Sequence, residues 1–106
     1  MAIMTYYLLE HRSNLHDNYR RVFSIAGHDL LLLQHQGTLH LLDNICPHAG
    51  YPMTDAQLIG TNLRCPMHGY LFAIDDGACV AAYEGPCRDL PTYRIEYREQ
   101  EIGVML

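Results

Sequence analysis

Short runs of apolar, β-branched and aromatic residues recur along the whole chain, and turn-forming residues separate them. Such runs predict strands at residues 6–10, 20–25, 29–35, 38–44, 57–64, 71–74, 78–82, 92–97 and 101–106. Four consecutive leucines at 30–33 are typical of a buried strand. No segment has the apolar spacing of a helix of useful length. The pattern therefore predicts an all-β domain.

Turn signals join several of these strands into hairpins. Gln36-Gly37 is expected to close a hairpin between the third and fourth strands, and the Asp-Asp-Gly sequence at 75–77 predicts a tight turn. The last two strands are expected to form another hairpin. Residues 83–93 differ, because one glycine and two prolines fall within seven residues. Proline disrupts regular strand pairing, so this segment is predicted to be an irregular loop.

The length of 106 residues suits one domain, which we expect to span residues 1–106. With 49% hydrophobic and 18% charged residues, the composition is that of a folded protein rather than a disordered one. The first residues lack the basic n-region and the long apolar core of a secretion signal. No apolar stretch approaches the roughly 20 residues of a membrane span. These features predict a cytoplasmic protein with no membrane contact.

The charge of the chain is unevenly distributed. Its formal net charge is −5, and all seven basic residues are arginines. Between residues 43 and 89 there are six acidic residues and two arginines, a net charge of −4, which leaves −1 for the rest of the chain. Nucleic-acid binding requires a basic face and is therefore not expected. The acidic segment would suit a positively charged protein partner, or it serves only solubility.

The same acidic segment contains two similar sequences, Cys-Pro-His-Ala-Gly at 46–50 and Cys-Pro-Met-His-Gly at 65–69. Thiolate and imidazole are both ligands for borderline-soft metals. The prolines stiffen the two segments, and the glycines allow the backbone to approach a bound group closely. The candidate ligands of a metal centre are Cys46, His48, Cys65 and His68.

Two cofactors could use this set of ligands. A single zinc ion would take all four, but zinc fingers of the C₂H₂ class pair cysteine with cysteine and histidine with histidine. A [2Fe–2S] cluster accounts for one cysteine and one histidine in each segment, because the cysteines can hold one iron and the histidines the other.

The sequence "CPHAG" followed by "CPMHGYLF", a glycine at 77 and "GPCRDLPTYRI" resembles Rieske-type iron–sulfur proteins over nearly the whole chain. The resemblance implies an all-β Rieske fold, with an antiparallel β base and a small cluster-binding subdomain at about 45–90. It also implies that the loop near Pro86 covers the cluster. The implied ligands of a Rieske-type [2Fe–2S] cluster, two Cys and two His, are Cys46, His48, Cys65 and His68.

Three positions depart from the respiratory and photosynthetic members of this family. Tyr51 and Met67 stand where those proteins have a pair of disulfide-forming cysteines, and Tyr70 stands where they have a serine that donates toward a sulfide. Fewer donors imply a potential low in the family range of about −150 to +300 mV. With no membrane anchor expected, the resemblance is to the soluble ferredoxins that serve ring-hydroxylating oxygenases.

This resemblance implies a one-electron carrier that passes electrons from a ferredoxin reductase to a terminal oxygenase or a related oxidoreductase. Such a carrier is not itself an enzyme, because the cluster performs the electron transfer and the protein supplies burial and a docking face. Two alternatives remain: the small Rieske subunit of a larger oxidoreductase such as nitrite reductase, and a zinc-binding β domain.

The remaining cysteines and histidines are expected to be structural. Cys79 and Cys87 are predicted to be reduced thiols, and Cys87 matches no ligand position of the family. The histidines without a cysteine at ligand spacing are expected on the surface or in strands: His11, His16, His28, His35 and His40. The other residues of the ligand segments either pack between them or form an exposed apolar collar for docking: Tyr51, Pro52, Met53, Met67 and Tyr70.

Overall fold

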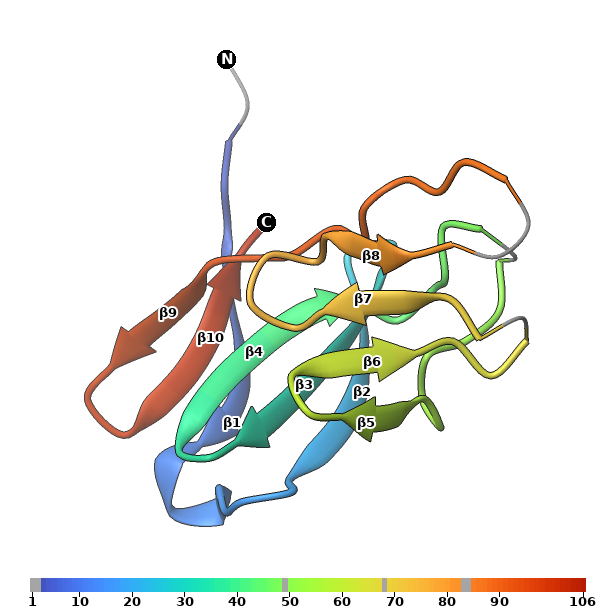
Figure 1. The fold of residues 1–106 in the computed structure, drawn as a ribbon. Coiled ribbons are helices and arrows are strands. Elements are labelled where there is room, and N and C mark those ends of the chain that lie inside the picture. Colours follow the sequence, from blue (N-terminus) through green and yellow to red (C-terminus); the bar gives the residue numbers. More distant parts are fainter. Residues whose placement is uncertain (1–2, 49, 68, 83–84) are drawn as a thin grey trace.

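Ten strands form three antiparallel sheets within residues 3–48, 50–67, 69–82 and 85–106, the part of the chain that the computed structural model describes (Figure 1). The strand orders are β2-β3-β4, β1-β10-β9 and β5-β6-β7-β8. The prediction of an all-β antiparallel fold is therefore confirmed. No helix in these ranges is long and apolar enough to cross a membrane.

The central sheet is a three-stranded meander. Its strands are β2 (Arg20–Ile25), β3 (His28–His35) and β4 (Thr38–Asp43), each within one residue of its predicted bounds. Gln36 and Gly37 connect β3 to β4 with φ angles of 50° and 80°. Two successive positive φ angles are those of a hairpin turn whose twist matches the flanking strands. The Gln-Gly sequence therefore closes the hairpin as predicted.

The second sheet joins the two ends of the chain. It contains β1 (Tyr6–His11), β9 (Ile95–Arg98) and β10 (Glu101–Met105), with β10 in the middle. Thr5 and Leu106 exchange two further backbone hydrogen bonds of 2.7 and 2.9 Å beyond the end of β1. The predicted last hairpin is confirmed, although its first strand begins at residue 95 rather than at 92.

The third sheet carries the candidate metal centre. Its four short strands are β5 (Gln57–Ile59), β6 (Asn62–Arg64), β7 (Leu71–Ala73) and β8 (Cys79–Ala81). The prediction of one strand over 57–64 is wrong, because Gly60, with a φ of 61°, turns the chain back and makes a hairpin of β5 and β6. The predicted pairing of β7 with β8 across the Asp-Asp-Gly turn is confirmed.

The strand β3 separates two hydrophobic cores. Leu31 and Leu33 face one core and Leu30 and Leu32 face the other, and all four are at most 2% exposed. This division follows from the alternation of side chains along a strand. The site core, which lies toward the third sheet, is Leu31, Leu33, Leu42, Cys46, Met53, Ala56, Leu63, Cys65, Tyr70, Phe72, Ile74 and Leu90. The base core is Leu9, Tyr19, Leu30, Leu32, Leu41 and Val104.

The irregular loop before β9 is held against the turn between β7 and β8. The Leu90 N–H donates to the Gly77 carbonyl (2.7 Å), and Gly77 has a φ of 75°. A Cβ at this position would collide with the Leu90 carbonyl. Glycine is therefore required here both by the backbone conformation and by the close approach of the loop.

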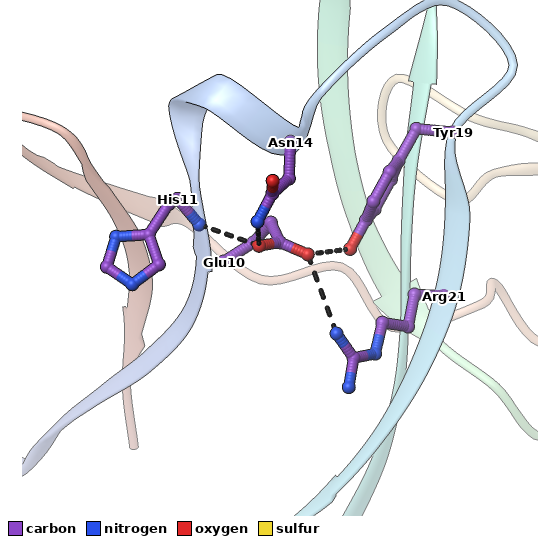
Figure 2. A network of polar contacts seen from close by, with 5 residues as sticks. All are labelled: Glu10, His11, Asn14, Tyr19 and Arg21. Carbon is purple, nitrogen blue, oxygen red and sulfur yellow. Dashed lines mark hydrogen bonds and ion pairs between the residues drawn. The ribbon is translucent and has the colours of Figure 1, made fainter.

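A buried carboxylate ties β1 to the segment that follows it (Figure 2). Glu10 is 7% exposed and accepts hydrogen bonds from the Asn14 side chain (2.8 Å), the His11 N–H (2.8 Å) and the Tyr19 hydroxyl (2.7 Å). The Arg21 guanidinium lies 3.6 Å away. These donors, led by Asn14 and Tyr19, lower the pKa of Glu10 from 4.5 to about 2.

The Glu10 network makes a pH-dependent contribution to stability. Because the pKa of Glu10 is lower in the folded state, its contribution is complete above pH 4.5 and is lost as the pH falls toward 2. A shift of this size corresponds to at most about 3 kcal/mol. We expect Glu10→Gln to lower the free energy of unfolding by about 2 kcal/mol at pH 7, and this difference from wild type should shrink below pH 4.

Denaturant unfolding of wild type and Glu10→Gln across this pH range measures the difference between their free energies of unfolding. The contributions of other titrating groups are the same in both proteins and cancel in this difference. Glu96→Gln is the matched control, since the Glu96 side chain is 39% exposed, against 7% for Glu10, and forms an ion pair with Arg98 at 3.6 Å. A difference between wild type and Glu10→Gln that stays constant down to pH 2 would contradict the assignment.

Candidate metal centre

The first loop, residues 46–51, is shaped by two backbone hydrogen bonds. The Cys46 N–H donates to the Tyr51 carbonyl (2.8 Å), and the Gly50 N–H donates back to the Cys46 carbonyl (2.8 Å). Gly50 has a φ of 66°, a conformation that favours glycine. This arrangement holds the cysteine at the inner end of a tight turn.

The second loop, residues 65–70, repeats this pattern and connects β6 to β7. The Cys65 N–H donates to the Tyr70 carbonyl (2.8 Å), and the Gly69 N–H donates to the Cys65 carbonyl (3.0 Å). Gly69 has a φ of 75°, and the Arg64 side chain would lie only 3.2 Å from a Cβ added there. The two similar sequences therefore make the same pair of backbone hydrogen bonds.

Both loops bury their cysteines. Cys46 and Cys65 are each 1% exposed, are not part of a disulfide, and belong to the same site core. A buried thiolate without a compensating charge is costly, whereas a thiolate that ligates a metal is stable. Two buried sulfur donors on matching turns therefore fit an iron–sulfur group.

The first loop also presents an imidazole. The His48 ring is half-buried and stacks on the Tyr70 ring, with centroids 4.0 Å apart and an angle of 17° between the planes. Tyr70 is fully buried and belongs to the second loop. A candidate ligand of one loop thus stacks on an aromatic ring of the other.

The fourth expected ligand, His68, lies outside the described residues. Among the residues that are described, no three Cys, His, Asp or Glu side chains are gathered as the ligands of one metal ion. A two-iron cluster does not require such a group, because each iron takes two protein ligands.

The residues that could form an apolar collar divide into two sets. Tyr51 is 40% exposed and Met67 is 48% exposed, and Pro52 is also exposed. In contrast, Met53 and Tyr70 are fully buried in the site core. Each loop therefore presents an apolar side chain to solvent, whereas Met53 and Tyr70 pack as structural residues.

The acidic residues considered for docking that the structure describes do not lie together. Asp55 borders a hollow beside the second loop, together with Arg64 and Cys65. Asp75 and Asp76 instead lie in the turn between β7 and β8, at the far end of these strands from the second loop (Figure 1). Glu84, the other acidic residue considered for docking, lies outside the described residues.

An arginine that the sequence did not single out anchors the chain between the two loops. Arg20 on β2 donates from Nη1 to the carbonyls of Thr54 (3.1 Å) and Ala56 (2.6 Å). Burial lowers the pKa of Arg20, while Asp55 acts in the opposite direction. The signal that could have revealed this contact is an arginine at the start of a strand with no acidic neighbour in sequence.

Cys79 and Cys87 are free and half-buried, and both pack against the site core. Burial, followed by the neighbouring Cys79 side chain and the charges of Cys79, Cys46 and Asp89, raises the pKa of Cys87 to about 12. The irregular loop thus places Cys87 near Cys46, and its residues Arg88 and Asp89 line a hollow together with Pro47. The loop therefore lies beside the first loop, and its covering of the cluster stays a prediction.

The other histidines lie on strands or on the surface, as predicted. His40 on β4 is the most buried at 9% exposed, and burial lowers its pKa although Asp75 lies 3.9 Å away and favours the charged form. The Nδ1 atom of His28 lies 3.3 Å from the Tyr93 hydroxyl. Neither contact brings these rings to the two loops.

The sequence of residues 5–94 matches the Rieske [2Fe–2S] domain. The ferredoxin component of the naphthalene 1,2-dioxygenase system of Pseudomonas putida is 30% identical over 83 residues, which cover 78% of each chain. The ferredoxin component of the alkene monooxygenase system of Xanthobacter autotrophicus is 32% identical over 65 residues. That alignment covers 60% of this chain and 53% of the relative.

The fold is also found in solved structures. A chain in the complex of reduced oxygenase and oxidized ferredoxin in carbazole 1,9a-dioxygenase superposes with a TM-score of 0.80 at 20% identity. The match covers 93% of this chain and 91% of the other. At this level of identity the likeness establishes the shared fold.

The contact between His48 and Tyr70 predicts a specific effect on cofactor retention. Tyr70→Leu removes the stacked ring and part of a buried side chain, and we expect it to cost about 2–3 kcal/mol of stability. It should also lower the iron and sulfide bound per chain, because His48 loses its platform. Tyr70→Phe keeps the ring and should therefore bind more iron and sulfide per chain than Tyr70→Leu.

Phe72→Leu is the matched control, because it makes a similar change in the same core, at a residue of β7 outside both loops. It should lower stability without lowering cofactor content. Denaturant unfolding and iron and sulfide analysis measure the two effects. Equal cofactor loss in Phe72→Leu and Tyr70→Leu would show that the stack has no particular role.

Proposed function

The chain belongs to the Rieske [2Fe–2S] domain family, and we propose that it is the ferredoxin of a multicomponent oxygenase system. The observation that carries this proposal is the pair of matching turns that buries Cys46 and Cys65 in one core. When bound, a Rieske-type [2Fe–2S] cluster supplies reversible one-electron transfer. The chain is therefore an electron carrier rather than an enzyme.

The proposed ligands divide by residue type, with two cysteines for one iron and two histidines for the other. Each loop would contribute one ligand of each kind, so the two turns hold the group between them. The ligands are Cys46, His48, Cys65 and His68. The burial of both thiols and the stacked position of His48 support this assignment for the three described residues.

We extend the Rieske domain over residues 1–106, with a cluster-binding subdomain at about 45–90. The pairing of β1 with β10 supports a single unit, because it joins the two ends of the chain. The four-stranded sheet and both loops fall within the proposed subdomain. The four cysteines are not joined in disulfides, which suits a reducing compartment, and we place the carrier in the cytoplasm.

The proposed partners are a reductase that supplies electrons and a terminal oxygenase that receives them. The relatives named above are ferredoxin components of a naphthalene dioxygenase system and of an alkene monooxygenase system. The outer tips of the loops, with Tyr51 and Met67 exposed, provide a short route from the ligands to a docked protein. Apolar side chains at this position suit transient docking.

The ligand assignment is tested by substitution in protein made under iron-replete conditions. Wild type should contain about two iron and two sulfide per chain and should show a rhombic EPR signal after dithionite reduction. His48→Ala and His68→Ala should each abolish that signal, because one iron loses a ligand. Cys65→Ser should do the same.

Two matched controls separate ligand loss from general damage. His35→Ala changes a half-buried histidine on β3, and Cys79→Ser changes a half-buried cysteine on β8. Both should keep the signal. Stoichiometric zinc without iron in the wild-type protein would instead support a zinc-binding β domain.

Charge near the second loop should accelerate docking to a cationic partner. Asp55→Asn removes the acidic residue beside this loop, and we expect a two- to threefold lower rate of electron transfer at low salt, roughly the effect of one rim charge. Screening should abolish the difference from wild type at about 0.5 M salt. The measurement is the second-order rate constant from the reduced carrier to a terminal oxygenase that accepts its electrons.

Asp76→Asn is the matched control, because Asp76 lies at the far end of the same sheet. Its rate should equal that of wild type at every salt concentration. If neither salt nor Asp55→Asn changes the rate, docking depends on the apolar tips of the loops alone.

A further inference from the structure

Two cysteines outside the ligand set lie next to each other. Cys79 begins β8 and Cys87 lies in the irregular loop that follows, and both side chains pack against the site core. The Cys79 N–H also donates to Asp89 Oδ1 (3.0 Å). With the bond from Leu90 to Gly77 described above, this contact holds the loop along the start of β8.

Both residues of the pair are partly exposed to solvent. Each residue is half-buried, with one side against the site core. The nearest backbone acceptors are the Ala81 carbonyl, 3.8 Å from the Cys79 sulfur, and the Arg88 carbonyl, 3.3 Å from the Cys87 sulfur. Hydrogen bonds from thiols are weak, so these contacts leave the sulfurs available for reaction.

We propose that Cys79 and Cys87 form a reversible disulfide when the carrier is exposed to a peroxide, which makes them a two-electron redox site distinct from the ligands of the iron–sulfur group. The inference does not depend on the proposed oxygenase partner. It depends on the adjacency of two thiols that the ligand assignment leaves unused.

Hydrogen peroxide is the two-electron oxidant of the pair. One sulfur attacks a peroxide oxygen, so that an S–O bond forms, the O–O bond breaks and one water leaves. The second sulfur then attacks the sulfenic acid, so that an S–S bond forms, the S–O bond breaks and a second water leaves. The two thiols lose two electrons and two protons, and hydrogen peroxide is reduced to two waters.

The raised pKa of Cys87 agrees with a pair that rests in the dithiol form. A thiol that stays protonated near neutral pH is a weak nucleophile, so oxidation is expected to require prolonged exposure. Once formed, the bond would fasten the irregular loop to β8. Because this loop also lies near Cys46, the disulfide would limit its movement away from the first loop.

The test uses the intact, cluster-loaded wild-type protein and hydrogen peroxide. After incubation and alkylation of the remaining thiols, the chain is cleaved after Glu84, which separates the two cysteines into different peptides. We expect a linked pair of peptides that contains Cys79 and Cys87, with both alkylation sites lost together. Dithiothreitol should restore both sites, and the visible absorbance of the cluster should persist.

Cys79→Ser and Cys87→Ser are the matched controls, and neither variant should give a linked peptide. The proposal is overturned if both thiols of the wild type remain open to alkylation. It is also overturned if either sulfur is oxidised without linkage, or if Cys87 links to Cys46 instead.

Discussion

The burial of two thiols from separate loops is the constraint on which the rest of this structure depends. Cys46 and Cys65 must reach the same core although one follows β4 and the other follows β6. Each loop meets this requirement with the same pair of backbone hydrogen bonds and with a glycine of positive φ. Because these bonds lie within each loop, the backbone of the loop, rather than flexible side chains, positions the cysteine sulfurs. Such preorganisation suits a redox centre, since little rearrangement is needed as its charge changes.

The base of the molecule supports this arrangement through the double burial of β3. The four leucines alternate between two cores, so the same strand packs against the second sheet and against the third sheet. A change of packing in the base core can therefore affect the two loops, because only the sheet that contains β3 lies between the base core and the site core. Arg20 adds a polar connection, because it binds two carbonyls in the chain between the loops. Packing against β3 and the hydrogen bonds of the Arg20 guanidinium thus both restrain the loops.

Acidic residues that belong to one segment of the sequence are separated in the folded chain. Residues 43–89 carry most of the negative charge in the sequence, yet Asp55 and Asp75 lie at opposite ends of the third sheet. A uniform acidic docking face is therefore not formed by these residues. At the loop tips, exposed apolar side chains stand beside a few charges of both signs. This combination favours a partner recognised by shape and modest electrostatic attraction.

The sequence by itself determined the class of fold, most of the strands and the candidate ligands, because these depend on neighbours along the chain. The alternation of apolar residues, the Gln36-Gly37 turn and the two Cys/His segments are all local signals. It could not show that residues 57–64 form a hairpin, since one glycine was the only signal of the turn. Nor could it separate buried Tyr70 from exposed Met67, or place Cys87 beside Cys79. Burial and adjacency in loops depend on segments distant in sequence that pack against them, and only the tertiary structure decided those contacts.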